Sequence, residues 1–245
     1  MALDLTPFLS DNAKSMRRSA IRDLLNVANK PEIISFGGGF PNVLTFPVED
    51  LKGIMAELMD EMPGKLLQYG STEGSVALRT QIAKRYQKEG VNVGIENIII
   101  TTASQQALDL LSRIFINPGD TVLCGLPSYL GALQAFWSYQ GMPIGIKADE
   151  EAEAVVSALC AIGKKPKFIY AIPDYQNPTG VTMTMEQRLE IVEVAKKYDL
   201  IILEDSPYKE IRFDGESLPT IYSMCPERVI LLGTLSKTFA PGLRL

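Results

Sequence analysis

Apolar residues in the second two-thirds of the chain follow two alternating patterns. From residue 97 onward, short runs rich in β-branched and aromatic residues are each followed by a stretch with apolar residues at helical spacing. The runs predict strands at NIIIT (97–101), TVLCG (121–125), PIGIK (143–147), KFIYAI (167–172), LIILED (200–205) and RVILLG (228–233). Such alternation is typical of a mostly parallel sheet covered by helices on both faces. We therefore predict an α/β fold with three layers, αβα.

The stretches between the strand runs predict amphipathic helices. They are SQQALDLLSRIF, the stretch after Ser128, EEAEAVVSALCAI and MEQRLEIVEVAKKY. Upstream, the spacing predicts one helix over 15–30, stopped by Pro31, and a second from about Val48 to Met62. The segment FGGGFPNVLTFP between these two helices is rich in Gly and Pro and predicts a loop.

Composition and charge narrow the class of protein. The chain has 245 residues, of which 46% are hydrophobic and 22% charged, as in ordinary globular proteins. Its formal net charge is -5 and it has no block of Lys and Arg, so an electrostatic footprint for nucleic acid or an anionic membrane is missing. No apolar run reaches the length of a signal peptide or a membrane span, and we expect a cytoplasmic protein.

The sequence contains no histidine, which restricts its chemistry. Ser-His and Cys-His nucleophile pairs and all His-containing metal sites are excluded. The three cysteines lie far apart without CxxC spacing, which argues against a zinc knuckle and a disulfide framework. Chemistry in this chain therefore requires Lys, Tyr, a carboxylate or a cofactor.

Polar residues follow most of the predicted strands, where the ligand crevice of a parallel sheet lies. They are Ser104 and Gln105 at a helix start, Tyr129, Asn177, Asp205, Tyr208, Thr234, Ser236, Lys237 and Arg244. Each alone has an ordinary explanation, such as a helix cap, a core aromatic, a turn or a surface charge. Together they offer partners for a phosphate, an aromatic ring, a phenolate, a ring nitrogen and an aldehyde. Pyridoxal phosphate carries all five groups.

Three motifs in this order, NPTG, EDSPY and SKTFAPGLR, resemble the class I/II aminotransferases of fold type I, which depend on pyridoxal phosphate. SAIRDLL, FGGGFPN, LQYGSTEGSVALR and SQQALDLL are similar to the 2-aminoadipate and kynurenine aminotransferase group. The resemblance spans nearly the whole chain. It implies an N-terminal helix and substrate-pocket loop over 1–47, and a cofactor-binding large domain over 48–245.

The resemblance also implies roles for residues around the cofactor ring. Lys237 would form the Schiff base and then move the proton between the substrate α-carbon and the cofactor. Asp205 would pair with the pyridine nitrogen and keep it protonated. Asn177 and Tyr208 would hydrogen-bond the phenolate oxygen, and Tyr129 would stack on the ring.

The phosphate would be held at the other end of the cofactor. The resemblance assigns this role to the amides of Ser104 and Gln105, the hydroxyl of Ser236 and the guanidinium of Arg244. Thr234 stands where many relatives have serine.

Three further positions resemble family residues outside the cofactor shell. Tyr69 is similar to a tyrosine that reaches the phosphate of the neighbouring subunit, which implies a homodimer with shared active sites. Gly39 and Arg22 match positions near the substrate pocket, where Asn177 would also contact substrate. A tight turn and a solvated helix face explain Gly39 and Arg22 equally well.

The sequence departs from the family at its end. It stops at Leu245, whereas relatives continue into a strand that completes the sheet and a C-terminal small domain. That small domain carries the arginine that binds the substrate α-carboxylate. We therefore expect a C-terminally truncated large domain with an unpaired sheet edge and no carboxylate clamp, so transaminase activity does not follow for this chain alone.

The activity implied by the resemblance is transamination of EC class 2.6.1. An L-amino acid with a 2-aminoadipate-like, aromatic or branched side chain would give its amino group to a 2-oxo acid such as 2-oxoglutarate. Alternatives from the same fold are a β-lyase or a decarboxylase, because the protein decides which bond of the substrate is broken. A regulatory sensor domain and a non-catalytic cofactor-binding fragment also remain open.

Overall fold

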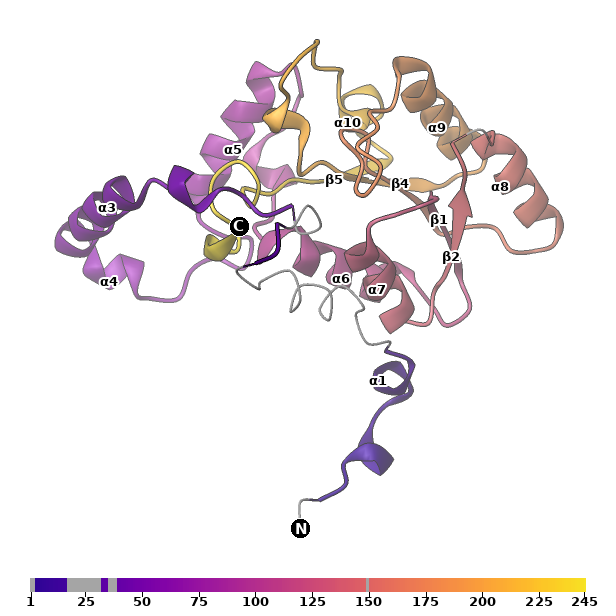
Figure 1. Cartoon of the computed structure of the whole chain (residues 1–245), viewed down its shortest axis with the longest axis horizontal. Coiled ribbons are helices and arrows are strands. Elements are labelled where there is room, and N and C mark those ends of the chain that lie inside the picture. The colour runs from indigo at the N-terminus through magenta and orange to yellow at the C-terminus, as the bar shows by residue number, and fades with distance from the viewer. Residues whose placement is uncertain (1–2, 17–31, 35–38, 149) are drawn as a thin grey trace.

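A single parallel sheet forms the centre of the molecule (Figure 1). The computed structural model describes residues 3–16, 32–34, 39–148 and 150–245. Five strands lie in the order β2-β1-β3-β4-β5, and every neighbouring pair is parallel. The strands are β1 (Thr121–Gly125), β2 (Met142–Ile146), β3 (Phe168–Ala171), β4 (Ile201–Asp205) and β5 (Val229–Leu232).

Helices cover both faces of the sheet because successive strand residues point to opposite sides. On one face, Leu123, Ile169 and Ile202 pack against α8 (Ala152–Ala161), α9 (Met185–Lys197) and α10 (Ile221–Met224). On the other face, the next residues along these strands, including Tyr170 and Leu203, pack against α6 (Ala103–Phe115) and α7 (Leu130–Ser138). The predicted three-layer αβα fold is confirmed.

Local sequence signals explain where these helices begin and which side they bury. In α9, the Thr184 hydroxyl accepts from the Gln187 amide and the Gln187 side chain accepts from the Thr184 amide, a reciprocal capping box. In α6, Leu108, Leu111 and Phe115 recur at three- and four-residue spacing and pack on the sheet. The amphipathic stretches predicted from sequence therefore correspond to α6, α7, α8 and α9.

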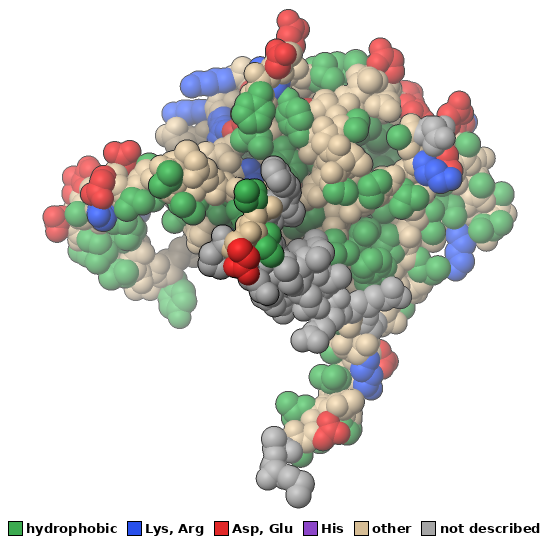
Figure 2. Space-filling model, in the orientation of Figure 1, with side chains coloured by type: hydrophobic (Ala, Val, Ile, Leu, Met, Phe, Trp, Pro, Cys, Tyr) green, Lys and Arg blue, Asp and Glu red, His purple; other side chains and the backbone are tan. Residues whose placement is uncertain are grey.

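The N-terminal third of the described chain lies outside the sheet layers (Figure 1). It contains α1 (Asp11–Ser15), α3 (Val48–Glu61), α4 (Pro63–Leu66) and α5 (Val76–Lys88). The prediction of a helix from about Val48 to Met62 is confirmed by α3, whereas most of the predicted helix over 15–30 lies outside the described residues. Figure 2 shows hydrophobic side chains gathered over α3 and α4. The exposed hydrophobic residues of these two helices include Ile54, Met55, Met59 and Leu66.

The predicted strand at 97–101 is wrong. This segment comprises the end of a 3-10 turn (Ile95–Asn97) and an extended stretch, and the Ile100 amide donates to Glu73 O at 2.9 Å instead of to a strand. The β-branched run favours extended backbone, but a strand also requires a hydrogen-bonding neighbour.

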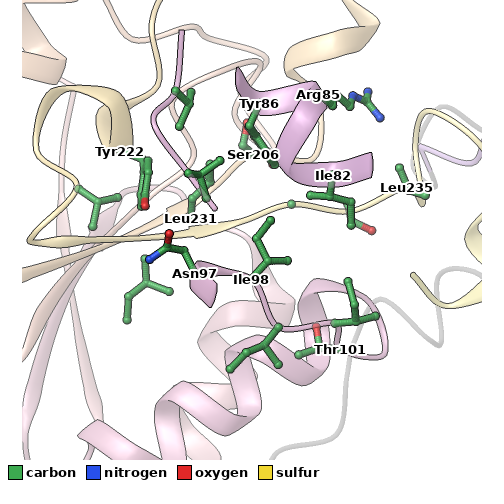
Figure 3. Close-up of a pocket in the computed structure, with 18 of the residues that line it drawn as sticks. Ile82, Arg85, Tyr86, Asn97, Ile98, Thr101, Ser206, Tyr222, Leu231 and Leu235 are labelled. Atoms are coloured by element: carbon green, nitrogen blue, oxygen red, sulfur yellow. The ribbon is translucent and has the colours of Figure 1, made fainter. Parts of the chain in front are cut away.

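A groove separates this segment from β5, whose outer edge pairs with no strand among the described residues (Figure 3). The cavity measures about 410 Å³ and has Ile98 and Ile100 on one side and Val229 and Leu231 on the other. Leu245 also lines it. The expectation of an unpaired sheet edge is therefore met at β5. Among the described residues, no helix has the length and apolar character needed to cross a membrane.

Candidate functional site

A buried carboxylate lies at the carboxyl end of β4. Asp205 is 3% exposed, and its Oδ2 accepts a hydrogen bond from the Tyr170 hydroxyl at 2.7 Å. Its Oδ1 is also buried, but no partner is present among the described residues. Burial raises the pKa of Asp205 to about 6, although the Tyr170 hydrogen bond acts in the opposite direction. An unsatisfied buried carboxylate oxygen is costly and is suited to a ligand that donates a hydrogen bond.

Two further strand ends bring aromatic and amide groups to the same region. The Asn177 side chain, after β3, donates from Nδ2 to the Tyr208 hydroxyl at 3.3 Å. Burial raises the pKa of Tyr129, the negative charges of Asp205 and Tyr208 raise it further, and the Arg244 charge lowers it. Tyr129 and Tyr208 both pack against the buried cluster that contains Tyr170, the hydrogen-bond partner of Asp205, so these side chains share one local environment.

Lys237 lies in the loop after β5 and faces this environment. Its Nζ donates to the Gly39 carbonyl at 3.1 Å and lies 5.9 Å from the centroid of the Tyr208 ring. Burial lowers the pKa of Lys237 below its ordinary value. Partial desolvation favours the neutral amine, which is the nucleophilic form.

The start of α6 and the loop after β5 form an anion-binding corner. Ser104 Oγ donates to the Gly233 carbonyl at 3.4 Å, which places the first turn of α6 against that loop. In the loop, Thr234 Oγ1 lies 2.9 Å from Ser236 Oγ and accepts from the Ser236 amide at 3.1 Å. Gln105 Nε2 donates to the Gly131 carbonyl at 3.0 Å. The backbone amide of Gln105 belongs to the first turn of α6 and therefore has no acceptor within the helix. Free amides at a helix N-terminus, next to hydroxyls, suit a phosphate.

Arg244 adopts a left-handed backbone conformation, with φ of 57°, and its side chain is exposed. Its Nη1 donates to the Pro241 carbonyl at 3.3 Å. The positive charge of the guanidinium lowers the pKa of Tyr129. Within the described part of the chain the guanidinium uses one of its five N–H donors, in the bond to Pro241. It therefore lies beside the site with capacity to bind an anion.

The three residues predicted outside the cofactor shell, Tyr69, Gly39 and Arg22, have three different outcomes. Tyr69 is 99% exposed, and the structure does not bring it to the residues around Asp205. Gly39 does reach the site, through its carbonyl at Lys237, and has a positive φ of 55° that favours glycine. Arg22 lies outside the described residues.

Sequence reasoning did not single out Tyr170, the buried partner of Asp205. It lies inside an apolar strand run, where a phenol is easily interpreted as a core aromatic. The available signal was its hydroxyl, because a buried tyrosine usually finds a hydrogen-bond partner.

The residues present fit pyridoxal phosphate. The unpaired Asp205 Oδ1 matches a protonated ring nitrogen, the partly desolvated Lys237 matches an aldehyde, and the corner at Ser104 matches a phosphate. Within the described part of the chain, no group of His, Cys, Asp and Glu has the arrangement of a metal site.

Comparison with known proteins decides the family. The model of the family described as "Aminotransferase class I and II" matches residues 31–245. The chain belongs to this family. Among aminotransferases of known name, aromatic-amino-acid aminotransferase 1 of Thermococcus litoralis is 42% identical over 252 residues, covering 99% of this chain and 60% of the relative. The 2-aminoadipate transaminase of Thermus thermophilus is 37% identical, in a match that covers 95% of this chain and 59% of the relative.

The fold agrees with this family assignment. A crystal structure of Pyrococcus horikoshii kynurenine aminotransferase, in complex with PMP and with substrates and products, superimposes with a TM-score of 0.91 at 43% identity. The match covers 98% of this chain and 61% of that structure. The chain thus spans about 60% of the length of these relatives, and its fold matches the fold type I large domain.

Proposed function

We propose that this chain is the cofactor-binding part of an aminotransferase that uses pyridoxal phosphate. The observation that carries the proposal is the buried Asp205 carboxylate, with one oxygen held by Tyr170 and the other unsatisfied. Within this family, a ring nitrogen is a fitting partner for that oxygen. Residues 1–47 would supply the N-terminal helix and substrate-pocket loop, and 48–245 the incomplete large domain.

Different residues would bind different groups of the cofactor. Asp205 would accept from the ring nitrogen, Asn177 and Tyr208 would bind the phenolate oxygen, and Tyr129 would cover the ring face. The Ser104 and Gln105 amides, the hydroxyls of Thr234 and Ser236, and Arg244 would hold the phosphate. When bound, the cofactor supplies an electron sink for cleavage of bonds at the substrate α-carbon.

Lys237 would serve both as the covalent attachment point and as the base. Its lowered pKa favours a neutral amine that can attack an aldehyde and later accept the proton from the substrate α-carbon. The Gly39 carbonyl orients Nζ through the hydrogen bond of 3.1 Å. Gly39, Arg22 and Asn177 would border the substrate.

The substrate class follows from the relatives. Two of them are named for aromatic amino acids and 2-aminoadipate, so we propose an L-amino acid with a long acidic, aromatic or branched side chain as donor. A 2-oxo acid such as 2-oxoglutarate would be the acceptor. Exposed Tyr69 would reach the phosphate of a second subunit in a homodimer.

Cofactor trapping tests the proposal. Pyridoxal phosphate is added to the purified chain, its visible spectrum is recorded, and borohydride reduction fixes any imine before peptide mass mapping. We expect one labelled site, Lys237, and loss of the label in Lys237→Ala but not in the surface variant Lys52→Ala. Label scattered over several lysines, or no absorbance change in the wild-type chain, would contradict cofactor binding.

Transamination is measured separately, with kynurenine or 2-aminoadipate as donor and 2-oxoglutarate as acceptor. Specific labelling without turnover would restrict the chain to cofactor binding.

A further inference from the structure

Tyr170 supplies the one side-chain hydrogen bond that the described residues make to Asp205. The distance from its hydroxyl to Oδ2 is 2.7 Å, and the two residues are 2% and 3% exposed. A hydrogen bond to an ionised group in such a buried position is stronger than one at the surface. The position of the carboxylate therefore depends on this phenol.

Strand register explains why the two groups meet. Tyr170 on β3 is paired with Leu203 on β4, and Asp205 lies two residues further along β4. Residues two apart on a strand point to the same face, so the Tyr170 side chain and Asp205 share one face of the sheet. The ring is held by Phe136 of α7, whose centroid lies 5.5 Å away at an interplanar angle of 76°. This edge-to-face contact orients the phenol along the sheet towards the strand end.

The protonation states fit a donor and an ionised acceptor. Burial and the nearby Asp205 charge raise the pKa of Tyr170 well above its ordinary value, so the phenol keeps its proton and donates. The same hydrogen bond opposes the effect of burial on the pKa of Asp205 and favours the carboxylate. Only the ionised carboxylate can hold a protonated ring nitrogen.

We propose that Tyr170 is a positioning residue for the cofactor, which fixes Asp205 through Oδ2 and thereby presents Oδ1 to the ring nitrogen of pyridoxal phosphate. This inference rests on the proposed function. It assigns to Tyr170 no contact with the cofactor itself, and its action passes entirely through the carboxylate.

The test compares two ligands in one variant. Tyr170→Phe keeps the ring that packs on Phe136 and removes only the hydroxyl. Dissociation constants are measured for pyridoxal phosphate and for an analogue that has carbon in place of the ring nitrogen. We expect pyridoxal phosphate to bind roughly tenfold to a hundredfold more weakly, as for loss of a hydrogen bond to a charged group. Binding of the analogue should be unchanged, because it makes no bond to Oδ1.

Tyr139→Phe is the matched control, because its hydroxyl also lies near a carboxylate, that of Asp109 at 3.3 Å, but this hydrogen bond is exposed to solvent. This control should change neither constant. Should Tyr170→Phe not fold, Phe136→Leu loosens the ring without removing the hydroxyl and should weaken pyridoxal phosphate binding selectively, by a smaller factor.

The outcomes are distinct. Selective weakening of pyridoxal phosphate supports the inference. Equal weakening of both ligands would show a structural role only, and unchanged binding of both would exclude any role for the hydroxyl. If the wild-type chain binds neither ligand, the proposed function fails and this inference fails with it.

Discussion

Two adjacent residues of β4 place buried carboxylates on opposite faces of the sheet. Asp205 points to the candidate site, whereas Glu204, which is 0% exposed, accepts from the amides of Ile221 at 3.0 Å and Tyr222 at 2.8 Å. Burial raises the pKa of Glu204 to about 7, although both amides act to lower it. One carboxylate is thus satisfied by backbone and anchors α10, and the other retains an oxygen for a ligand.

The raised pKa of Glu204 predicts how stability depends on pH. A carboxyl whose folded pKa exceeds its unfolded value binds its proton more tightly in the folded state. The contribution of Glu204 to the free energy of unfolding should therefore be highest below pH 4.5 and fall as pH rises towards 7. The slope is at most about 1.4 kcal/mol per pH unit for one proton.

Urea unfolding at several pH values checks this prediction. Glu204→Gln should reduce the fall in the free energy of unfolding between pH 5 and 7. Asp205, whose pKa is also raised, accounts for part of the pH dependence that remains in this variant. Glu57→Gln on the exposed face of α3 should leave the pH dependence unchanged. A Glu204→Gln variant with the wild-type pH dependence would contradict the assignment.

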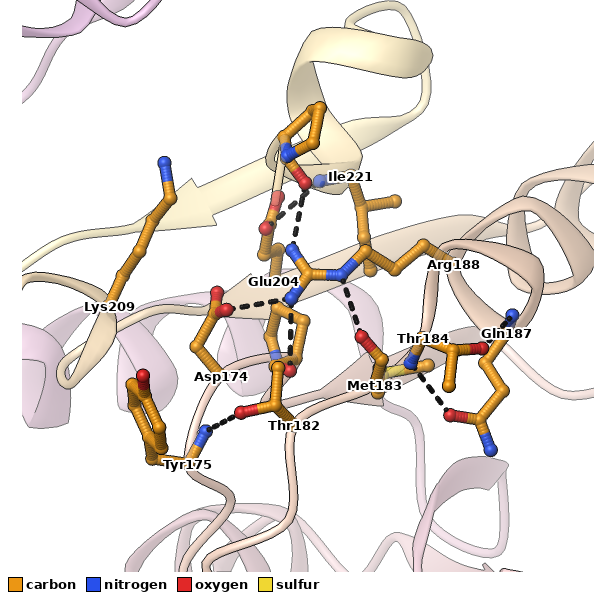
Figure 4. A network of polar contacts seen from close by, with 12 residues as sticks. Asp174, Tyr175, Thr182, Met183, Thr184, Gln187, Arg188, Glu204, Lys209 and Ile221 are labelled. Carbon is orange, nitrogen blue, oxygen red and sulfur yellow. Dashed lines mark hydrogen bonds and ion pairs between the residues drawn. The ribbon is translucent and has the colours of Figure 1, made fainter. Parts of the chain in front are cut away.

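At the scale of elements, one buried arginine joins three segments (Figure 4). Arg188, on α9, is 0% exposed and donates from Nη2 to Asp174 Oδ1 at 2.7 Å, in the loop after β3. It also donates from Nη1 to the Pro219 carbonyl at 2.8 Å, just before α10. The loop that contains Asp174 continues directly to Asn177, so this ion pair helps to fix the position of Asn177 in the candidate site.

Removal of this arginine should be costly. Arg188→Met leaves the Asp174 carboxylate buried without its partner, and loss of one partner of a buried pair costs about 3–5 kcal/mol. Arg228→Met is the matched control, because its partner Asp199 is 80% exposed, and it should cost less than about 1 kcal/mol. Urea unfolding measures both values. If both variants lost the same free energy of unfolding, burial would not make the Arg188 ion pair more important for stability than the exposed pair of Arg228.

At the scale of the whole molecule, the candidate site joins segments that are far apart in sequence. Its groups come from the start of α6, the loops after β1, β3, β4 and β5, and Gly39. A ligand that bonds all of them stabilises the folded state by mass action and suppresses opening of each segment.

Hydrogen exchange with mass spectrometry tests this joint stabilisation. Added pyridoxal phosphate should slow exchange in residues 103–106, 175–181, 205–209 and 233–245 together. Helices α3 and α4, which lie away from the sheet in Figure 1, should exchange at the same rate with or without the cofactor. Asp205→Asn should weaken the protection at all four segments. Protection limited to 233–245 would mean that the ligand contacts Lys237 alone.

The sequence predicted the layers and the polar residues at the strand ends, because side-chain periodicity and strand-to-loop order are local properties of the chain. The α/β class, the parallel strands and the convergence of Asp205, Tyr208, Asn177 and Lys237 all followed from local patterns. The motifs NPTG, EDSPY and SKTFAPGLR indicated the family, and the comparison with known proteins confirmed it.

Only the tertiary structure decided which groups pair. The run at 97–101 has the composition of a strand but pairs with no strand of the described residues, and pairing is a property of two segments. The Tyr170 hydroxyl meets Asp205 because of the register between β3 and β4, and Arg188 meets Asp174 because α9 packs across the sheet. Each of these contacts joins residues more than ten positions apart, so no local pattern specifies them. Burial, which sets the pKa of Asp205, Glu204 and Lys237, likewise exists only once the layers have packed.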